Sequence, residues 1–287
     1  MLKLISSMPR PLRRVARRVV KKASWPFTVR WLSKLSQHPD PAAAKLAAAI
    51  RAAITQGFDG ESEHWIEQIE AQRRDLAACV EPLISEELGE PGPFDDGVSV
   101  ALACSHSAVI QIALVLHALV REFRPETALE LGTNIGLSAA YEAAAMAVNR
   151  HGRLVTLEVS PHRTARAKVL HKALQLADRV TYVNGYFQDT LENTLESLPP
   201  IDFAFIDGHH QKQPTLDYFS QVWTHSSEGA VFVFDDIRWS AGMKEAWDQL
   251  ARDPRMRLAV DLLEIGVCVT TRRTGDQATF RTRPLLL

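Results

Sequence analysis

Acidic side chains end several short apolar stretches of the sequence, and their types and positions could do chemistry. The acids are Glu130, Glu158, Asp207, Asp235 and Asp236. In an open sheet of parallel strands, ligands bind beyond the carboxyl ends of the strands. Carboxylates gathered on one such edge repel one another unless a ligand or a cation offsets their charge. The pattern therefore predicts a site for a cation or for an amine-bearing ligand.

Two glycines follow the first acid, Glu130, in the spacing E-x-G-x-x-x-G, which places them at Gly132 and Gly136. Glycines after a first strand permit a tight turn and a close approach of a ligand to the backbone. The spacing differs from the G-x-G-x-x-G of dinucleotide-binding proteins, and no G-x-x-x-x-G-K-[ST] phosphate loop is present. Glu158, 28 residues after Glu130, lies where an acid can accept hydrogen bonds from both hydroxyls of a ribose.

Alternating strands and helices after residue 105 would position these acids. We expect strands at 127–131, 152–159, 179–185, 201–207 and 229–236, and closing strands at 257–263 and 266–273. Helical patterns cover 108–123 ahead of the first strand, and 138–148, 161–176, 189–198 and 214–223 between strands. Continuous apolar strands separated by helices predict a parallel sheet covered on both faces. The expected fold class is α/β, a doubly wound, mostly parallel seven-stranded sheet.

A helical extension is expected at residues 40–97, ahead of the main domain at 98–287. Asp40 is suited to cap its first helix, with Pro41 in the first turn. A second helix follows a turn marked by Gly57 and Gly60. The loop sequence at 89–97 marks the boundary between the two parts.

Overall composition is that of a globular protein with a sizeable core: the 287 residues are 46% apolar and 23% charged. The cysteines, Cys79, Cys104 and Cys268, match neither a disulfide framework nor a close-spaced zinc pattern, which fits a reducing compartment. No apolar run approaches the roughly 18 residues of a membrane span. We therefore expect a cytoplasmic protein.

The N-terminal arm, residues 1–39, is basic and amphipathic. It contains ten Lys/Arg and no Asp/Glu, so the rest of a chain of formal charge −1 carries −11. A tail, a solvated helix packed on the body and a partner-binding arm all fit this pattern. Trp25, Phe27 and Trp31 would supply interfacial aromatics to an anionic membrane surface, where the protein would be peripheral. The acidic body argues against nucleic acid as the partner.

Four sequence stretches appear in an order and spacing that resemble a known family. They are "ALELGTNIGLSA", the stretch "VTLEVSPHRTARAKVLHKALQLADRVTYVNGYFQDTL", "FAFIDGHH" and "VFVFDDI". Over residues 100–273 the chain resembles the class I S-adenosylmethionine-dependent methyltransferases. Within these it is similar to the metal-dependent O-methyltransferases of the catechol type and to the group called methyltransferase 24. The resemblance implies a Rossmann-like fold, S-adenosylmethionine as cofactor and O-methyl transfer.

The resemblance also implies roles for individual residues. The implied cofactor-binding residues are Glu130, Gly132, Thr133, Asn134, Gly136, Ser138, Glu158, Gln188 and Asp207. Among them, Ser138 lies near the methionine carboxylate, Glu158 binds the ribose hydroxyls and Gln188 contacts adenine. Asp207, Asp235 and Asp236 match the ligands of a divalent metal, and three oxygen ligands suit Mg²⁺. Asp207 and His210 are the implied catalytic residues.

The chain departs from the catechol-type pattern at two places. Catechol-type enzymes have Asp-Asn where this chain has Asp235-Asp236, although related antibiotic-sugar enzymes carry two acids there. Catechol-type enzymes also have a lysine base three residues after the first metal ligand. This chain has His210 at that position, with His209 before it and Lys212 beyond. A histidine can act as a base near neutral pH. Two structural interpretations compete with these roles. The two histidines could be ordinary exposed polar residues, and Asp235 and Asp236 could cap the following helix.

The leading hypothesis is an O-methyltransferase that acts on a small hydroxylated acceptor with assistance from a divalent metal. Metal and base would generate an alkoxide or phenolate in line with the sulfonium methyl group. The alternative is a non-catalytic binding protein that keeps the fold and uses its basic arm, since fold does not determine function. The glycine spacing argues against a nicotinamide-dependent oxidoreductase. Membrane binding through residues 1–39 and a homodimer are left open.

Overall fold

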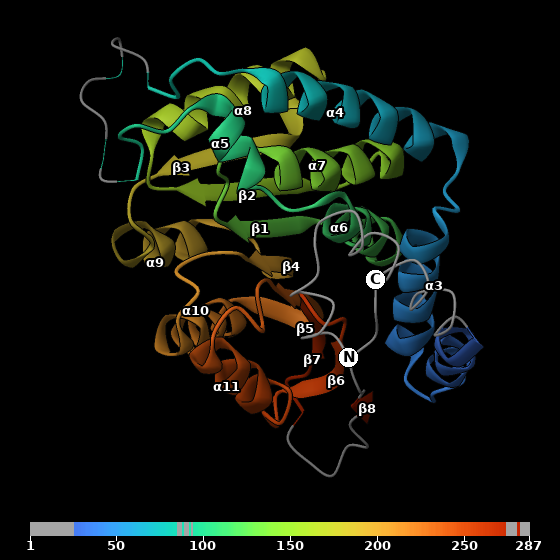
Figure 1. Ribbon diagram of the computed structural model, residues 1–287. Helices are drawn as coiled ribbons and strands as arrows, with labels where there is room; N and C mark the ends of the chain where they lie inside the picture. Colours follow the sequence, from blue (N-terminus) through green and yellow to red (C-terminus); the bar gives the residue numbers. More distant parts are fainter. Residues whose placement is uncertain (1–25, 85–87, 89–91, 93, 274–279, 282–287) are drawn as a thin grey trace.

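One sheet runs through the computed structural model, which describes residues 26–84, 88, 92, 94–273 and 280–281. Its strands are β1 (Thr127–Leu131), β2 (Arg153–Glu158), β3 (Val180–Asn184), β4 (Ile201–Ile206), β5 (Ser226–Phe234), β6 (Met256–Asp261), β7 (Gly266–Thr270) and β8 (Phe280–Arg281). Their order is β3-β2-β1-β4-β5-β7-β6-β8, and β7 runs antiparallel to both of its neighbours (Figure 1). All seven expected strands are present, which confirms the mostly parallel sheet. The two-residue strand β8 adds to β6 beyond the expected seven.

Strand order reverses between β1 and β4. The chain builds outward from β1 to β3 and then returns to pair β4 with the other side of β1. Ligands of open α/β sheets bind outside the carboxyl ends of the strands at such a reversal. Three of the acids sit at this edge: Glu158 ends β2, Asp207 follows β4 and Asp235 follows β5.

Helices cover both faces of the sheet, as expected for a doubly wound fold (Figure 1). They are α3 (Pro41–Thr55), α4 (Gly60–Ala78), α5 (Val100–Ser105), α6 (Ile110–Phe123), α7 (Leu137–Asn149), α8 (Pro161–Ala173), α9 (Phe187–Ser197), α10 (Lys212–Thr224) and α11 (Ala241–Leu250). Helices α3 to α8 contribute to one apolar cluster, and α9 to α11 contribute to the other. Ala128 and Leu129, neighbours in β1, belong to different clusters because successive side chains of a strand point to opposite faces.

The N-terminal helices pack into the first of these clusters. Residues 26–36 are helical, and Leu32 and Leu35 within them are fully buried. Asp40 caps α3 as expected by accepting the backbone N–H of Ala42 at 2.9 Å, and it also pairs with Arg257 of β6 at 2.6 Å. This part of the basic arm is therefore a packing element. The domain boundaries at 39/40 and 97/98 stay predictions.

The remainder of the arm, residues 1–25 with Trp25, lies outside the described residues. Phe27 is 75% exposed, whereas Trp31 packs partly against the core. No helix in the described part of the chain is long and apolar enough to cross a membrane.

Candidate active site

The loop of residues 132–136, which joins β1 to α7, requires glycine at both ends. Gly132 has φ 109° and Gly136 has φ 85°, both in the left-handed region. A Cβ atom on Gly132 would lie 2.1 Å from the backbone oxygen of Asp207. Between the glycines, the hydroxyl of Thr133 lies 2.5 Å from that of Thr156 in β2. The loop is thus pressed against the end of β4, beside the acid that follows this strand.

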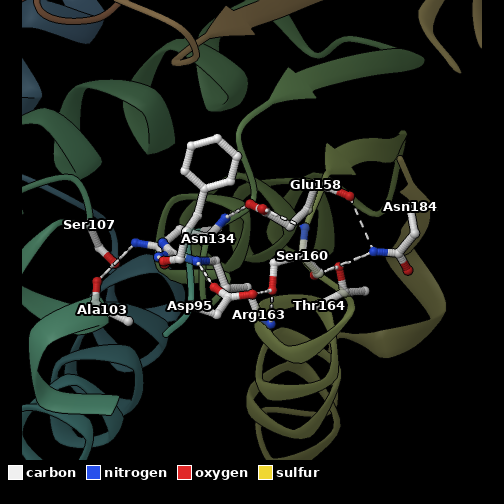
Figure 2. A network of polar contacts seen from close by, with 10 residues as sticks. Asp95, Ala103, Ser107, Asn134, Glu158, Ser160, Arg163, Thr164 and Asn184 are labelled. Carbon is white, nitrogen blue, oxygen red and sulfur yellow. Dashed lines mark hydrogen bonds and ion pairs between the residues drawn. The ribbon is translucent and has the colours of Figure 1, made fainter. Parts of the chain in front are cut away.

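Glu158 ends β2 and organises this loop from the other side. Its Oε2 accepts the backbone N–H of Asn134 at 2.7 Å, and its Oε1 accepts that of Ser160 at 3.0 Å (Figure 2). Each oxygen keeps a lone pair, so the carboxylate can also accept two hydroxyl groups. Burial raises the pKa of Glu158, while these two N–H donors and the charge of Arg163 oppose the rise. Gln188 is exposed in the first turn of α9, which follows the neighbouring strand β3.

Glu130 and Ser138 face the protein interior beneath the loop, and the expectation that they contact a cofactor stays a prediction. Glu130 is fully buried and accepts the Ser138 hydroxyl at 2.5 Å and the Thr156 hydroxyl at 2.6 Å. Residue 130 lies inside β1, so its side chain points to a helix-covered face of the sheet. Burial raises the pKa of Glu130 to about 7, although both hydroxyl groups oppose this.

A row of polar side chains crosses the sheet beneath the loop. Glu130, Thr156 and Tyr182 are adjacent in the register of β1, β2 and β3. The Tyr182 hydroxyl lies 2.5 Å from Nδ1 of His171, and Nε2 of His171 lies 2.8 Å from the carbonyl oxygen of Gly136. Burial lowers the pKa of His171 to about 4. The neutral ring therefore donates its Nε2–H to the Gly136 carbonyl and accepts the Tyr182 hydroxyl at Nδ1.

Three carboxyl groups lie together beyond β4 and β5. Asp207 and Asp235 interact electrostatically, and Asp235 Oδ1 accepts the backbone N–H of Asp236 at 2.8 Å. Burial raises the pKa of Asp207 well above its usual range, and the charges of Asp235, Glu130 and Asp236 raise it further. Burial and the Asp236 charge raise the pKa of Asp235 to about 7. Burial and mutual repulsion thus disfavour full ionisation of the Asp207–Asp235 pair.

The His210 ring lies between two of these carboxyl groups. Its Nε2 is 3.7 Å from Oδ1 of Asp207, and its Nδ1 is 3.6 Å from Oδ2 of Asp236. Burial raises the pKa of Asp236, and the His210 charge opposes that rise. His209 turns away, with its Nδ1 2.5 Å from the hydroxyl of Tyr218. The structure thus brings His210, and not His209, to the acidic cluster.

The predicted metal ligands Asp207, Asp235 and Asp236 lie near one another in space, but their side chains do not converge on a common point. Among the residues that the structure describes, no group of three His, Cys, Asp or Glu side chains is placed to hold a metal ion. The His210 ring occupies the gap between Asp207 and Asp236. The capping interpretation of the fifth-strand acids is wrong, because the next helix is α11 and its N-cap is Ser240.

Comparisons with known proteins agree with this geometry. A family model described as a methyltransferase domain matches residues 129–237. A catechol O-methyltransferase of Mycobacterium tuberculosis is 30% identical over 156 residues, covering 52% of this chain and 68% of that protein. The chain belongs to the class I S-adenosylmethionine-dependent methyltransferases. A catechol O-methyltransferase of Niastella koreensis is 32% identical to this methyltransferase over 123 residues, which cover 42% of the chain and 54% of the relative.

Solved structures share the fold of the methyltransferase. An O-methyltransferase from Bacillus cereus in complex with SAH is 23% identical with a TM-score of 0.50, covering 74% of this chain and 92% of that one. A cofactor-bound protein from MTB is 20% identical with a TM-score of 0.52, covering 83% and 100%. Both likenesses concern the fold. The named relatives place this enzyme in the S-adenosylmethionine-dependent O-methyltransferase family.

Interactions at this methyltransferase site include residues that the sequence patterns did not single out. Arg163 and the buried Asp95 form an ion pair at 2.9 Å beside the loop. Trp239 is 72% exposed, with its ring 6.4 Å from that of His210. One signal could have revealed Arg163: it lies in the first turn of α8, where the helix dipole disfavours a cation. No such signal marks Trp239, because only the fold brings it to His210.

Proposed function

We propose that this enzyme transfers the methyl group of S-adenosylmethionine to a hydroxyl oxygen of a small acceptor. The observation that carries the proposal is the contact between Gly132 and Asp207, which sets the glycine loop directly beside the acidic cluster. A cofactor held by the loop would then present its sulfonium methyl to an acceptor held by the cluster. Positioning of this kind supplies much of the rate enhancement in group transfer.

The cofactor would lie along the carboxyl ends of β1, β2 and β3. Gly132, Thr133, Asn134 and Gly136 would surround its methionine part, with the loop held from below by the buried hydrogen bonds of Glu130 and Ser138. Each Glu158 oxygen accepts one backbone N–H and could also accept one ribose hydroxyl. Gln188 would contact the adenine from the start of α9. S-adenosylmethionine, when bound, supplies a positively charged sulfur that makes its methyl group electrophilic.

His210 would take the proton from the acceptor hydroxyl. Its ring nitrogens lie 3.7 Å and 3.6 Å from carboxyl oxygens of Asp207 and Asp236. The negative charge of these groups would stabilise the imidazolium ion that forms. Loss of this proton would leave the acceptor oxygen free to bond to the methyl carbon, and the electron pair of the broken carbon–sulfur bond would stay on sulfur.

A divalent cation would assist this step if Asp207, Asp235 and Asp236 held it. The donor set suits such an ion in kind, because hard cations prefer carboxylate oxygens. It also suits the ion in charge, because burial and then the charges of neighbouring carboxylates raise the pKa of the Asp207 and Asp235 carboxyl groups, so a cation there would offset an unfavourable charge. The ion would neutralise this charge and polarise the acceptor hydroxyl. His210 occupies part of the same space, so the metal and the ring compete for it.

Transfer of a labelled methyl group to a panel of small hydroxylated acceptors tests the proposal. His210→Asn should lower turnover by roughly 10²- to 10⁴-fold, the usual contribution of a general base, and retain S-adenosylhomocysteine binding. His209→Asn is the matched control, since that ring bonds to Tyr218 instead. Activity that is lost with EDTA and restored by Mg²⁺ would support the metal. Full turnover of His210→Asn in EDTA would refute both forms of activation.

A further inference from the structure

Arg163 is the centre of a polar network that joins three separate parts of the chain. Its Nε donates to Oδ1 of Asp95, its Nη2 to the carbonyl oxygen of Phe94, and its Nη1 to Oδ1 of Asn134, each at 2.9 Å. The side chain is 14% exposed. Phe94 and Asp95 precede α5 in the chain. Asn134 lies in the glycine loop, and Arg163 itself belongs to α8 (Figure 2).

Asn134 carries the connection onward in two directions. Its side-chain amide donates to the carbonyl oxygen of Ala103 at 2.9 Å and to the hydroxyl of Ser107 at 3.1 Å. Its backbone N–H donates to Oε2 of Glu158 at 2.7 Å. Figure 2 shows Asn134 between Ala103 and Ser107 on one side and Glu158 on the other. Moving this residue would therefore disturb the acid proposed to bind ribose.

The other end of the network is anchored in the interior. The Asp95 side chain is 1% exposed, and it accepts the Ser160 hydroxyl at 2.5 Å as well as Nε of Arg163. A buried carboxylate is stable only with its partners in place. The planar guanidinium holds Asp95 and Asn134 with different N–H groups, whereas a lysine ammonium is a single point charge.

We propose that Arg163 is a positioning residue that holds segment 94–107 on the glycine loop, so that both form one cofactor site. The proposal rests on the proposed function, because it takes loop 132–136 and Glu158 as the cofactor contacts. Arg163 itself would not touch the cofactor. Its effect would pass through the side chain of Asn134 to the Glu158 carboxylate.

Calorimetric titration with S-adenosylhomocysteine tests this role without a known acceptor. Arg163→Lys keeps a cation near Asp95 but loses the fork that also reaches Asn134, so we expect affinity to fall about tenfold. Arg166→Lys is the matched control. Arg166 lies one turn later in α8 and contacts the Pro82 carbonyl oxygen at 3.4 Å and Glu81 at 4.0 Å, outside the loop. The Arg166→Lys variant should bind S-adenosylhomocysteine with the affinity of the wild type.

Asn134→Gly provides a second variant, because glycine tolerates the φ of 48° at this position while the side-chain bonds are lost. If the effect of Arg163 passes through Asn134, the double variant should bind little more weakly than Asn134→Gly alone. Hydrogen exchange should also show that S-adenosylhomocysteine protects segment 94–107 in the wild type and less so in Arg163→Lys. Equal affinities of Arg163→Lys and Arg166→Lys, or additive losses in the double variant, would overturn the inference. A wild type that fails to bind S-adenosylhomocysteine would instead overturn the proposed function itself.

Discussion

Replacing the buried acid beneath the loop, Glu130→Gln, should change how the stability of the enzyme depends on pH. Burial raises the pKa of Glu130 from 4.5 to about 7. Between these pH values the folded state binds more protons than the unfolded chain, so the free energy of unfolding falls as pH rises. The stabilising contribution of the protonated acid is fully present below about pH 4.5 and lost above about pH 7.

Linkage gives the size of the effect as roughly 3 kcal/mol, since each pKa unit corresponds to about 1.4 kcal/mol. Glutamine should keep the local bonding. Ser138 can donate to its amide oxygen, and the amide N–H can donate to Thr156, whose hydroxyl is also 2.5 Å from that of Thr133. The variant should therefore match the wild type near pH 5 and exceed its stability by about 2–3 kcal/mol near pH 8.

Urea unfolding at a series of pH values, followed by circular dichroism, measures this difference. Glu126→Gln makes the same change at an exposed residue just before β1. It should alter neither the free energy of unfolding nor its dependence on pH. The neighbouring acid Glu142 is fully buried, and its carboxyl oxygens have no hydrogen-bond partner among the described residues. Burial raises the pKa of Glu142 and the Glu130 charge raises it further, so the difference measured between the wild type and Glu130→Gln includes the change at Glu142. Parallel curves for the wild type and Glu130→Gln would refute the argument that burial holds this proton.

Three further changes test other parts of the structure. Glu158→Gln should weaken S-adenosylhomocysteine binding about tenfold, the scale of a lost charge-assisted hydrogen bond, and an unchanged calorimetric affinity would remove this residue from the ribose site. Leu35→Ala should lower the free energy of unfolding in urea by about 2–5 kcal/mol because the side chain is fully buried. Phe27→Ala, at a 75% exposed position, should lower it by less than about 0.5 kcal/mol, and equal losses would contradict the packing of residues 26–36. Deleting residues 1–25 should abolish salt-sensitive binding to anionic vesicles and preserve the fold, and a full-length chain that ignores such vesicles at low salt would exclude the membrane partner.

Local sequence was sufficient for most of the fold. The bounds of β1 were predicted correctly because an apolar run lies between Pro125 and Gly132, and proline and glycine both interrupt regular secondary structure. β5 begins at Ser226 instead of the expected residue 229, since its first residues are polar and pair with β4 across an irregular register. Helix α11 was not expected. The start of β5 depends on a partner strand that no local periodicity records, whereas the buried residues of α11 do recur at helical spacing: Met243, Ala246, Trp247 and Leu250.

The direction in which a side chain points was the part of the site that spacing could not supply. The E-x-G-x-x-x-G pattern marks Glu130 as chemically interesting, yet its carboxyl group lies under the loop, because residue 130 comes one position before the strand ends.

Arg163 illustrates the opposite case, in which a local conflict carried information. A cation in the first turn of a helix is unfavourable by a few tenths to about 1 kcal/mol. Its position there is explained only by contacts from outside the helix, and the structure supplies them at Asp95, Phe94 and Asn134. An unfavourable residue at a helix end therefore marks a position where contacts from distant segments of the chain are worth seeking.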